Sequence, residues 1–143
     1  MQIPHDLQHF PEPTLIVIAD HLTAKFFLAG GDAVQELDGV ALPRDRRTDK
    51  DTAFVDVDSG RVSSGEPKDE EERLNRYGKL VAVAIERYLH QHTAAHFYLV
   101  MVGDVADAVK RHLDKPAHAL IKKEIAKDVM KEPLVDVLRR LFA

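Results

Sequence analysis

The chain has 143 residues, of which 45% are hydrophobic and 31% charged, and its net charge is −4. This length and composition are those of one globular domain with a sizeable core. The mild acidity, with a pI near 6.0, excludes broad electrostatic capture of nucleic acid or an anionic membrane, although it allows a local basic stripe. The chain has no cysteine, which excludes disulfides, thiol nucleophiles and Cys-based metal sites and fits a reducing compartment.

Residues 1–13 contain three prolines and predict an extended lead-in to a single domain over residues 14–143. The lead-in lacks the charged start and apolar run of a secretion signal. No apolar stretch in the chain reaches ten residues, so none could span a bilayer. We therefore expect a cytoplasmic protein with no membrane partner.

Three segments of strand length open the domain, at residues 14–19, 23–29 and 34–42. The first, TLIVIA, is apolar on both faces, which is typical of a strand in the middle of a sheet. The Gly-Gly-Asp sequence at 30–32 is a tight-turn signal between the second and third segments. The pattern predicts an opening meander of three antiparallel strands.

Residues 43–67 form a long connection rich in charge and glycine, and we expect them to be the most mobile internal part of the chain. Phe54, Val55 and Val57 could add a short strand there. A long helix is then predicted over residues 68–92 from its apolar stripe at i, i+3, i+4 and i+7 spacing. The stripe residues expected to be buried are Tyr77, Val81, Ile85 and Tyr88, whereas Glu70–Glu72 should stay exposed.

The second half of the chain predicts a strand at 97–102, a helix at 105–113 with Asp104 as its N-cap, and a last helix at 134–142. A strand followed by a helix implies a crossover, so part of the sheet should be parallel. Residues 119–125 fit either a helix or a strand. The predicted fold class is α/β, with a mixed sheet of about five strands and flanking helices.

No motif in the sequence predicts a cofactor, a metal site or a catalytic centre. Walker, GxGxxG and HExxH patterns are absent, and His90, His92 and His96 straddle a helix end with no nearby carboxylate to orient them. Asp20 and Asp104 each follow an apolar strand, where ligands bind in open α/β sheets. An aspartate at a strand end is also a common turn or helix cap, so both interpretations stay open.

A Gly- and Ser-rich loop at residues 60–67 leads into the long helix. Its backbone donors beside a helix N-terminus suit a phosphate or another chain, including a second copy in a homodimer; the alternative is a solvated linker. If the protein binds RNA, the basic side chains around this loop would contact its phosphates, although the acidic Glu70–Glu72 lie among them. The candidate nucleic-acid-binding residues are Arg61, Lys68, Arg73 and Arg76.

The order of motifs over residues 14–142 resembles the bacterial host attachment protein family. Its members begin with an apolar strand, Ala-Asp, then Ala-Arg/Lys and an aromatic-containing strand, as in TLIVIADHLTAKFFLAG here. VDVDSGRVSS is similar to the family's Ser-Asp-Arg-Pro-Gly-Arg stretch without its proline, and the tail EIAKD is the closest local match. The positions that carry these motifs are Asp20, Lys25, Asp58, Gly60, Lys127 and Asp128.

This family is similar in turn to the middle domain of archaeo-eukaryotic peptide-chain release factors, which has an RNase H-like fold. That likeness implies a strand rather than a helix at residues 119–125. It also places Ser64-Gly65-Glu66 where release factors carry Gly-Gly-Gln, and a glutamate there argues against stop-codon release. A second departure is Gly103-Asp104-Val105, where the family usually has Pro-Pro-Arg.

The resemblance implies two functions of different classes, and the strand-end carboxylates suggest a third. The first is a non-enzymatic, release-factor-like module that binds a ribosome or tRNA. The second is a protein required, indirectly and from the cytosol, for attachment to host cells. The third is a metal-dependent hydrolase that uses Asp20 and Asp104.

Overall fold

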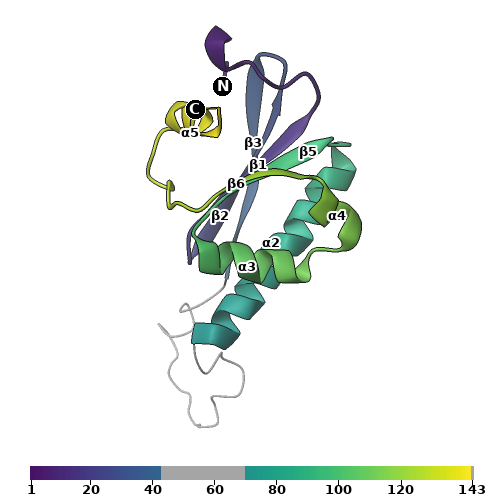
Figure 1. Cartoon of the computed structure of the whole chain (residues 1–143), viewed down its shortest axis with the longest axis vertical. Helices are drawn as coiled ribbons and strands as arrows, with labels where there is room; N and C mark the ends of the chain where they lie inside the picture. The colour runs from purple at the N-terminus through teal and green to yellow at the C-terminus, as the bar shows by residue number, and fades with distance from the viewer. Residues whose placement is uncertain (43–69, 143) are drawn as a thin grey trace.

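The computed structural model describes residues 1–42 and 70–142 and shows a mixed sheet flanked by helices on both faces (Figure 1). In this part of the chain five strands form one sheet in the order β3-β2-β1-β5-β6. The strands are β1 (Thr14–Ala19), β2 (Thr23–Gly30), β3 (Ala33–Ala41), β5 (His96–Val100) and β6 (Ile121–Ile125). The helices are the 3-10 turn η1 (His5–Leu7), α2 (Glu70–Gln91), α3 (Gly103–His112), α4 (Lys115–Ala119) and α5 (Leu134–Leu141).

Strand β1 lies at the centre of the sheet. It pairs antiparallel with β2 and parallel with β5, and all six of its residues are buried. A strand buried on both faces cannot alternate apolar and polar residues, which explains why TLIVIA is almost continuously apolar. The antiparallel meander β1-β2-β3, the central position of β1 and the parallel pairing of β5 and β6 confirm the sequence predictions.

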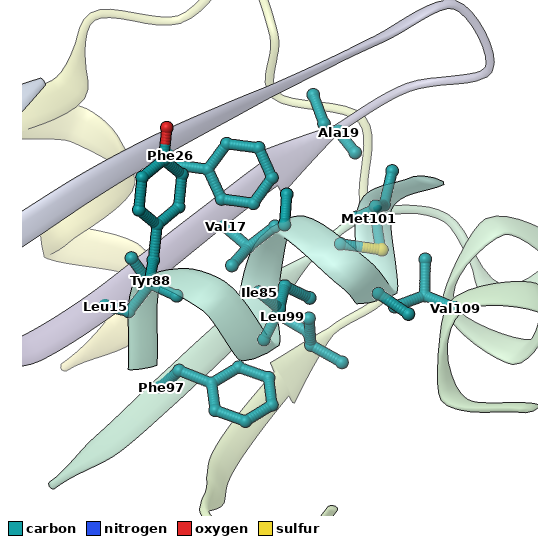
Figure 2. Close-up of a cluster of buried hydrophobic side chains, with 14 of the residues drawn as sticks. Leu15, Val17, Ala19, Phe26, Ile85, Tyr88, Phe97, Leu99, Met101 and Val109 are labelled. Atoms are coloured by element: carbon teal, nitrogen blue, oxygen red, sulfur yellow. The ribbon is translucent and has the colours of Figure 1, made fainter. Parts of the chain in front are cut away.

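Helices α2 and α3 cover one face of the sheet. Figure 2 shows the core that they form with it, in which Ile85 and Tyr88 of α2 face side chains of β1, β2 and β5. The ring of Tyr88 packs against that of Phe26 at a centroid distance of 5.3 Å. The four stripe residues Tyr77, Val81, Ile85 and Tyr88 are all buried and Glu70–Glu72 are exposed, as the helical spacing predicts.

Helix α2 packs unusually close to α3 at Gly78. A Cβ added to Gly78 would lie 2.6 Å from the backbone carbon of Ala108 and 2.7 Å from its Cβ. Both helices place small residues at this contact, which lets their backbones approach and orients α2 along the sheet. The sequence pattern did not predict this close contact.

The opposite face is covered by α5 and by the N-terminal segment. Ile3, Leu7 and Phe10 are buried there beside Leu138 and Leu141 of α5. The lead-in is therefore not merely extended: it contains the turn η1, and Gln2 forms an isolated bridge with Ala33 of β3. Its apolar residues lie too far apart to give a periodic signal, so only the tertiary packing reveals their role.

The second half of the fold differs locally from the sequence prediction. The strand predicted at 97–102 ends at Val100, and Asp104 lies inside α3, whose N-cap is Val102. A short helix, α4, was not predicted; Asp114 caps it by accepting a hydrogen bond from the Ala117 amide at 2.9 Å. Residues 121–125 form a strand, as the family resemblance implied and against the helical periodicity of the segment.

Two expectations fall on residues 43–69, outside the described part of the chain. They are the mobility of residues 43–67 and the short strand around Phe54, Val55 and Val57. The sheet is compatible with an RNase H-like fold, and that finer assignment stays a prediction.

The contact at Gly78 gives a test of the helix packing. We expect Gly78→Ala to lower the free energy of unfolding by about 1–3 kcal/mol, because the new methyl group would push α3 away; overpacking of this size outweighs the better helix propensity of alanine, about 1 kcal/mol. Gly103→Ala is the matched control, since an added Cβ there meets nothing within 4 Å. Urea denaturation measures both, and equal stability of the two variants would contradict the close packing.

Candidate functional site

The carboxyl ends of β1 and β5 meet at one edge of the sheet because these strands run parallel. Asp20 and His21 follow β1, and Asp104 lies in the first turn of α3 after β5. The first turns of α2 border the same edge, where His21, Arg73 and Tyr77 line a cavity of about 220 Å³ together with Leu22, Glu70 and Leu74. Ligands bind at this position in open α/β sheets, so we take this cavity, the strand-end cavity, as the candidate site.

Asp20 holds the turn between β1 and β2. One of its carboxylate oxygens, Oδ1, accepts hydrogen bonds from the amides of Leu22 at 2.8 Å and Thr23 at 2.9 Å. The amide of Asp20 in turn donates to the carbonyl of Thr23. This is the turn-capping role that the sequence left open for a strand-end aspartate.

His21 and Asp104 form a pair across the edge. His21 Nε2 lies 2.9 Å from one Asp104 oxygen and 3.1 Å from the other, and both side chains are 56% exposed. Asp104 also accepts from the Val105 amide at 2.8 Å. The hydrogen bond from His21, together with its charge and that backbone amide, lowers the pKa of Asp104, and the small burial of the carboxyl opposes this only in part.

The hydroxyl of Tyr77 is the least expected feature of the site. Tyr77 is only 1% exposed, and its hydroxyl is the one buried side-chain polar atom of the described residues that has no hydrogen-bond partner. Burial, and after it the negative charge of Asp20, raises the pKa of Tyr77 above its ordinary value. The phenol is therefore a neutral donor at neutral pH, and leaving it unpaired costs free energy.

Arg73 adds a cation to the cavity wall. It lies one turn before Tyr77 on α2, is half-buried, and takes part in no ion pair within residues 1–42 and 70–142. Arg76, by contrast, pairs with Glu72 at 3.5 Å and is exposed on α2. The acidic groups of the site are Asp20, Asp104 and Glu70, and the first two already accept hydrogen bonds from the protein.

The arrangement can bind an acceptor-rich anion. Arg73 offers a guanidinium with no ion-pair partner among the described residues, and His21 offers an imidazole held in place by Asp104. Tyr77 also lines the cavity, and its buried phenol has no hydrogen-bond partner in the same part of the chain. A phosphate group takes hydrogen bonds from such donors, and arginine is especially suited to it. Glu70 on the cavity wall opposes a large negative charge, which favours one phosphate over a cluster of them.

The other predicted residues divide into two groups. Arg61, Lys68, Asp58 and Gly60 lie outside the described part of the chain. Lys25 points from β2 to the sheet face opposite α2, and Lys127 and Asp128 lie in the connection between β6 and α5, so these three are not part of the strand-end cavity. Asp128 accepts from the Met130 amide at 3.1 Å and so closes a turn there.

Within residues 1–42 and 70–142, no three His, Asp or Glu side chains are grouped so that they could hold a metal ion. This includes His90, His92 and His96. Asp20 and Asp104, the carboxylates of the hydrolase alternative, are engaged by a turn and by a histidine respectively. Among the described residues, no helix combines the length and apolar character needed to cross a membrane.

Two residues of the site were missed from the sequence, Tyr77 and His21. Tyr77 was expected only as a buried stripe residue, because helical spacing says which face is buried and not where the hydroxyl ends. His21 directly follows Asp20, and that position at the end of a central strand was a signal that could have identified it.

The fold and site define an α/β domain with a mixed five-stranded sheet and a cavity at the carboxyl ends of its parallel strands β1 and β5. The chain also matches, over residues 15–141, the model of the family described as "Protein required for attachment to host cells". Because this match covers nearly the whole chain, the protein belongs to that host attachment family.

Comparison with solved structures gives a similar fold in a protein described as "Archaeal protein", with a TM-score of 0.52 and 11% sequence identity. The similarity covers 89% of this chain and 33% of that one, so this chain spans about a third of its length. At such low identity the likeness shows the fold alone. None of the curated proteins compared with the chain matches it.

The unpaired phenol predicts an unusual effect on stability. We expect Tyr77→Phe to leave the free energy of unfolding unchanged or to raise it by up to about 1 kcal/mol, since it removes a buried donor that has no partner. Tyr88→Phe is the matched control on the same helix: its hydroxyl donates to the Asp38 carbonyl at 2.8 Å, so its loss should cost about 1 kcal/mol. Chemical denaturation measures both, and equal losses would show that Tyr77 has a partner.

The lowered pKa of Asp104 predicts a pH dependence. A carboxylate whose folded-state pKa is depressed stabilises the fold above its ordinary pKa, 3.8, and loses that contribution as the pH falls through the folded-state value. Wild type should therefore exceed Asp104→Asn in stability at neutral pH, by less than about 1 kcal/mol for so exposed a pair, and the difference should vanish in acid. Asp107→Asn on the same helix controls for the loss of one carboxylate. A stability difference between wild type and Asp104→Asn that does not depend on pH would contradict the pairing.

Proposed function

We propose that this protein is a non-enzymatic module that binds RNA of the translation apparatus, a ribosome or a tRNA, through the strand-end cavity. The observation that supports it most is that one cavity is lined by Arg73, His21 and Tyr77, whose buried hydroxyl has no hydrogen-bond partner among the described residues. A backbone phosphate would satisfy the phenol donor and balance the guanidinium charge. The proposed function is binding alone, so it requires no catalytic group.

The position of the cavity supports contact with a large partner. It lies at the carboxyl ends of β1 and β5, next to the first turns of α2, which directly follow residues 43–69 in the chain. Arg76 is exposed and lies three positions after Arg73 on α2, and residues at i and i+3 are neighbours on a helix surface, so a strand of nucleic acid that reaches Arg73 could also reach Arg76. Arg61 and Lys68, the other two predicted contacts, lie outside the described residues.

The family description names attachment to host cells. Binding of ribosomal or transfer RNA would make any contribution of this chain to attachment an indirect one. Phosphate contacts of this kind carry no sequence information, so the module should bind RNAs of different sequence alike.

Binding of labelled tRNA and of ribosomes over a salt series tests the proposal. Each phosphate contact adds about 0.7–0.9 to the slope of log affinity against log salt, so Arg73→Ala/Arg76→Ala should flatten that slope by about 1.5 and weaken binding at low salt. Tyr77→Phe should weaken binding while the fold keeps its stability. Lys122→Ala, which removes an exposed charge from the edge strand β6, is the control and should bind nearly as wild type.

Two outcomes would contradict the proposal. One is the absence of wild-type binding to tRNA and ribosomes at low salt. The other is an unchanged affinity and slope in the Arg73→Ala/Arg76→Ala protein, because the cavity would then not carry the contact.

A further inference from the structure

A second and larger cavity, of about 340 Å³, lies on the sheet face opposite α2. It opens between strands β1 to β3 and residues 129–134, which connect β6 to α5. Its volume falls within the range of small-molecule sites in proteins. None of the residues of the strand-end cavity lines it, so it is a separate site.

The floor of this cavity is apolar. Ile18, Phe27, Val34 and Val129 line it, and each is less than a tenth exposed. Met130 forms part of the wall, and methionine side chains adapt readily to the shape of a ligand. The floor can therefore receive an apolar group and remove it from water.

A β-bulge shapes the wall at Lys25. The register between β2 and β3 shifts there, so that Asp38 and Gly39 of β3 lie opposite the single residue Lys25 of β2. The strands approach so closely that a Cβ on Gly39 would lie 2.6 Å from the Ala24 carbonyl oxygen. Bulges of this kind change the direction in which a side chain points, and Tyr88 fixes this one through the Asp38 carbonyl.

Two side chains of opposite charge stand on the rim and have no ion-pair partner in the part of the chain that the structure describes. Lys25 and Glu36 line the cavity from neighbouring strands, and neither forms an ion pair within the described residues. Glu132 also lines it, but its carboxylate is held by Arg140 in a bidentate pair at 2.8 and 2.9 Å, which lowers the pKa of Glu132. Met1 also lines the cavity, and its ammonium group donates to the Val34 carbonyl at 2.7 Å. Lys25 and Glu36 are therefore the side-chain charges that remain for a ligand.

We propose that this cavity binds a small zwitterion with an apolar body, of which a free apolar α-amino acid is the simplest. The ligand's carboxylate would pair with Lys25, its ammonium group with Glu36, and its side chain would lie on Phe27 and Val129. Both rim charges would then be balanced, which a fatty acid or a simple amine could not achieve. The turn closed by Asp128 holds Met130 and its neighbours over the bound side chain.

Titration of the whole chain with leucine, methionine and phenylalanine, followed by calorimetry and by amide chemical shifts, tests the proposal. We expect saturable binding with shifts at Lys25, Phe27 and residues 129–134. N-acetyl-leucine, which lacks the ammonium charge, and leucinamide, which lacks the carboxylate, should each bind about tenfold or more weaker.

Two protein variants test the contribution of each rim charge separately. Lys25→Met should weaken the binding of leucine about tenfold or more and leave the affinity for leucinamide unchanged. Glu36→Gln should also weaken the binding of leucine, but it should leave the affinity for N-acetyl-leucine unchanged. Both positions are exposed, so the fold should tolerate the changes, and Lys122→Met and Glu12→Gln are controls of the same kind at exposed sites. No binding of any of the three amino acids at millimolar concentration would overturn the proposal, as would octanoate binding at this site more tightly than leucine.

Discussion

The burial of β1 on both faces is the constraint on which the rest of the structure depends. All six residues from Thr14 to Ala19 are buried, between α2 and α3 on one side and α5 and the N-terminal segment on the other. Burying one large aliphatic side chain contributes about 1.5–3 kcal/mol, so this single strand supplies a large share of a marginal net stability. A shift of one residue in its register would exchange the two faces, and the register is therefore strongly specified.

The fixed register of β1 positions both cavities. Its last residue, Ala19, sets where Asp20 and His21 leave the sheet, and its pairing of Ile18 with Lys25 sets one wall of the cavity on the opposite face. The two cavities thus lie on opposite sides of one rigid strand. A ligand in one has no direct contact with a ligand in the other.

Two tyrosines of α2 show how the same residue type serves packing in one place and a site in another. Tyr88 buries its ring against Phe26 and satisfies its hydroxyl on the bulge of β3. Tyr77 is buried as deeply, yet its hydroxyl has no partner among the described residues. Stability alone would favour phenylalanine at residue 77, and a buried donor kept at a cost is typical of a position used for binding.

The sequence predicts the elements whose signal is local and periodic. The continuous apolar run of β1, the turn after Gly30 and the stripe of α2 each followed from spacing. The other features depend on tertiary packing. The N-terminal segment joins the core through three scattered apolar residues. Helix α2 contacts α3 closely at Gly78 because neither backbone carries a large side chain there. Of the residues that line the strand-end cavity, Arg73 was a predicted contact. The position of the Tyr77 hydroxyl depends on tertiary contacts that no sequence pattern reports.

The most direct test of the central claim, that the strand-end cavity is the RNA-contacting surface, is an amide chemical-shift map of the chain recorded with and without tRNA. We expect changes at residues 20–22, 73–77 and 103–105, with Lys25 and residues 129–134 unaffected. Changes confined to the opposite face of the sheet, or no changes at all, would contradict it.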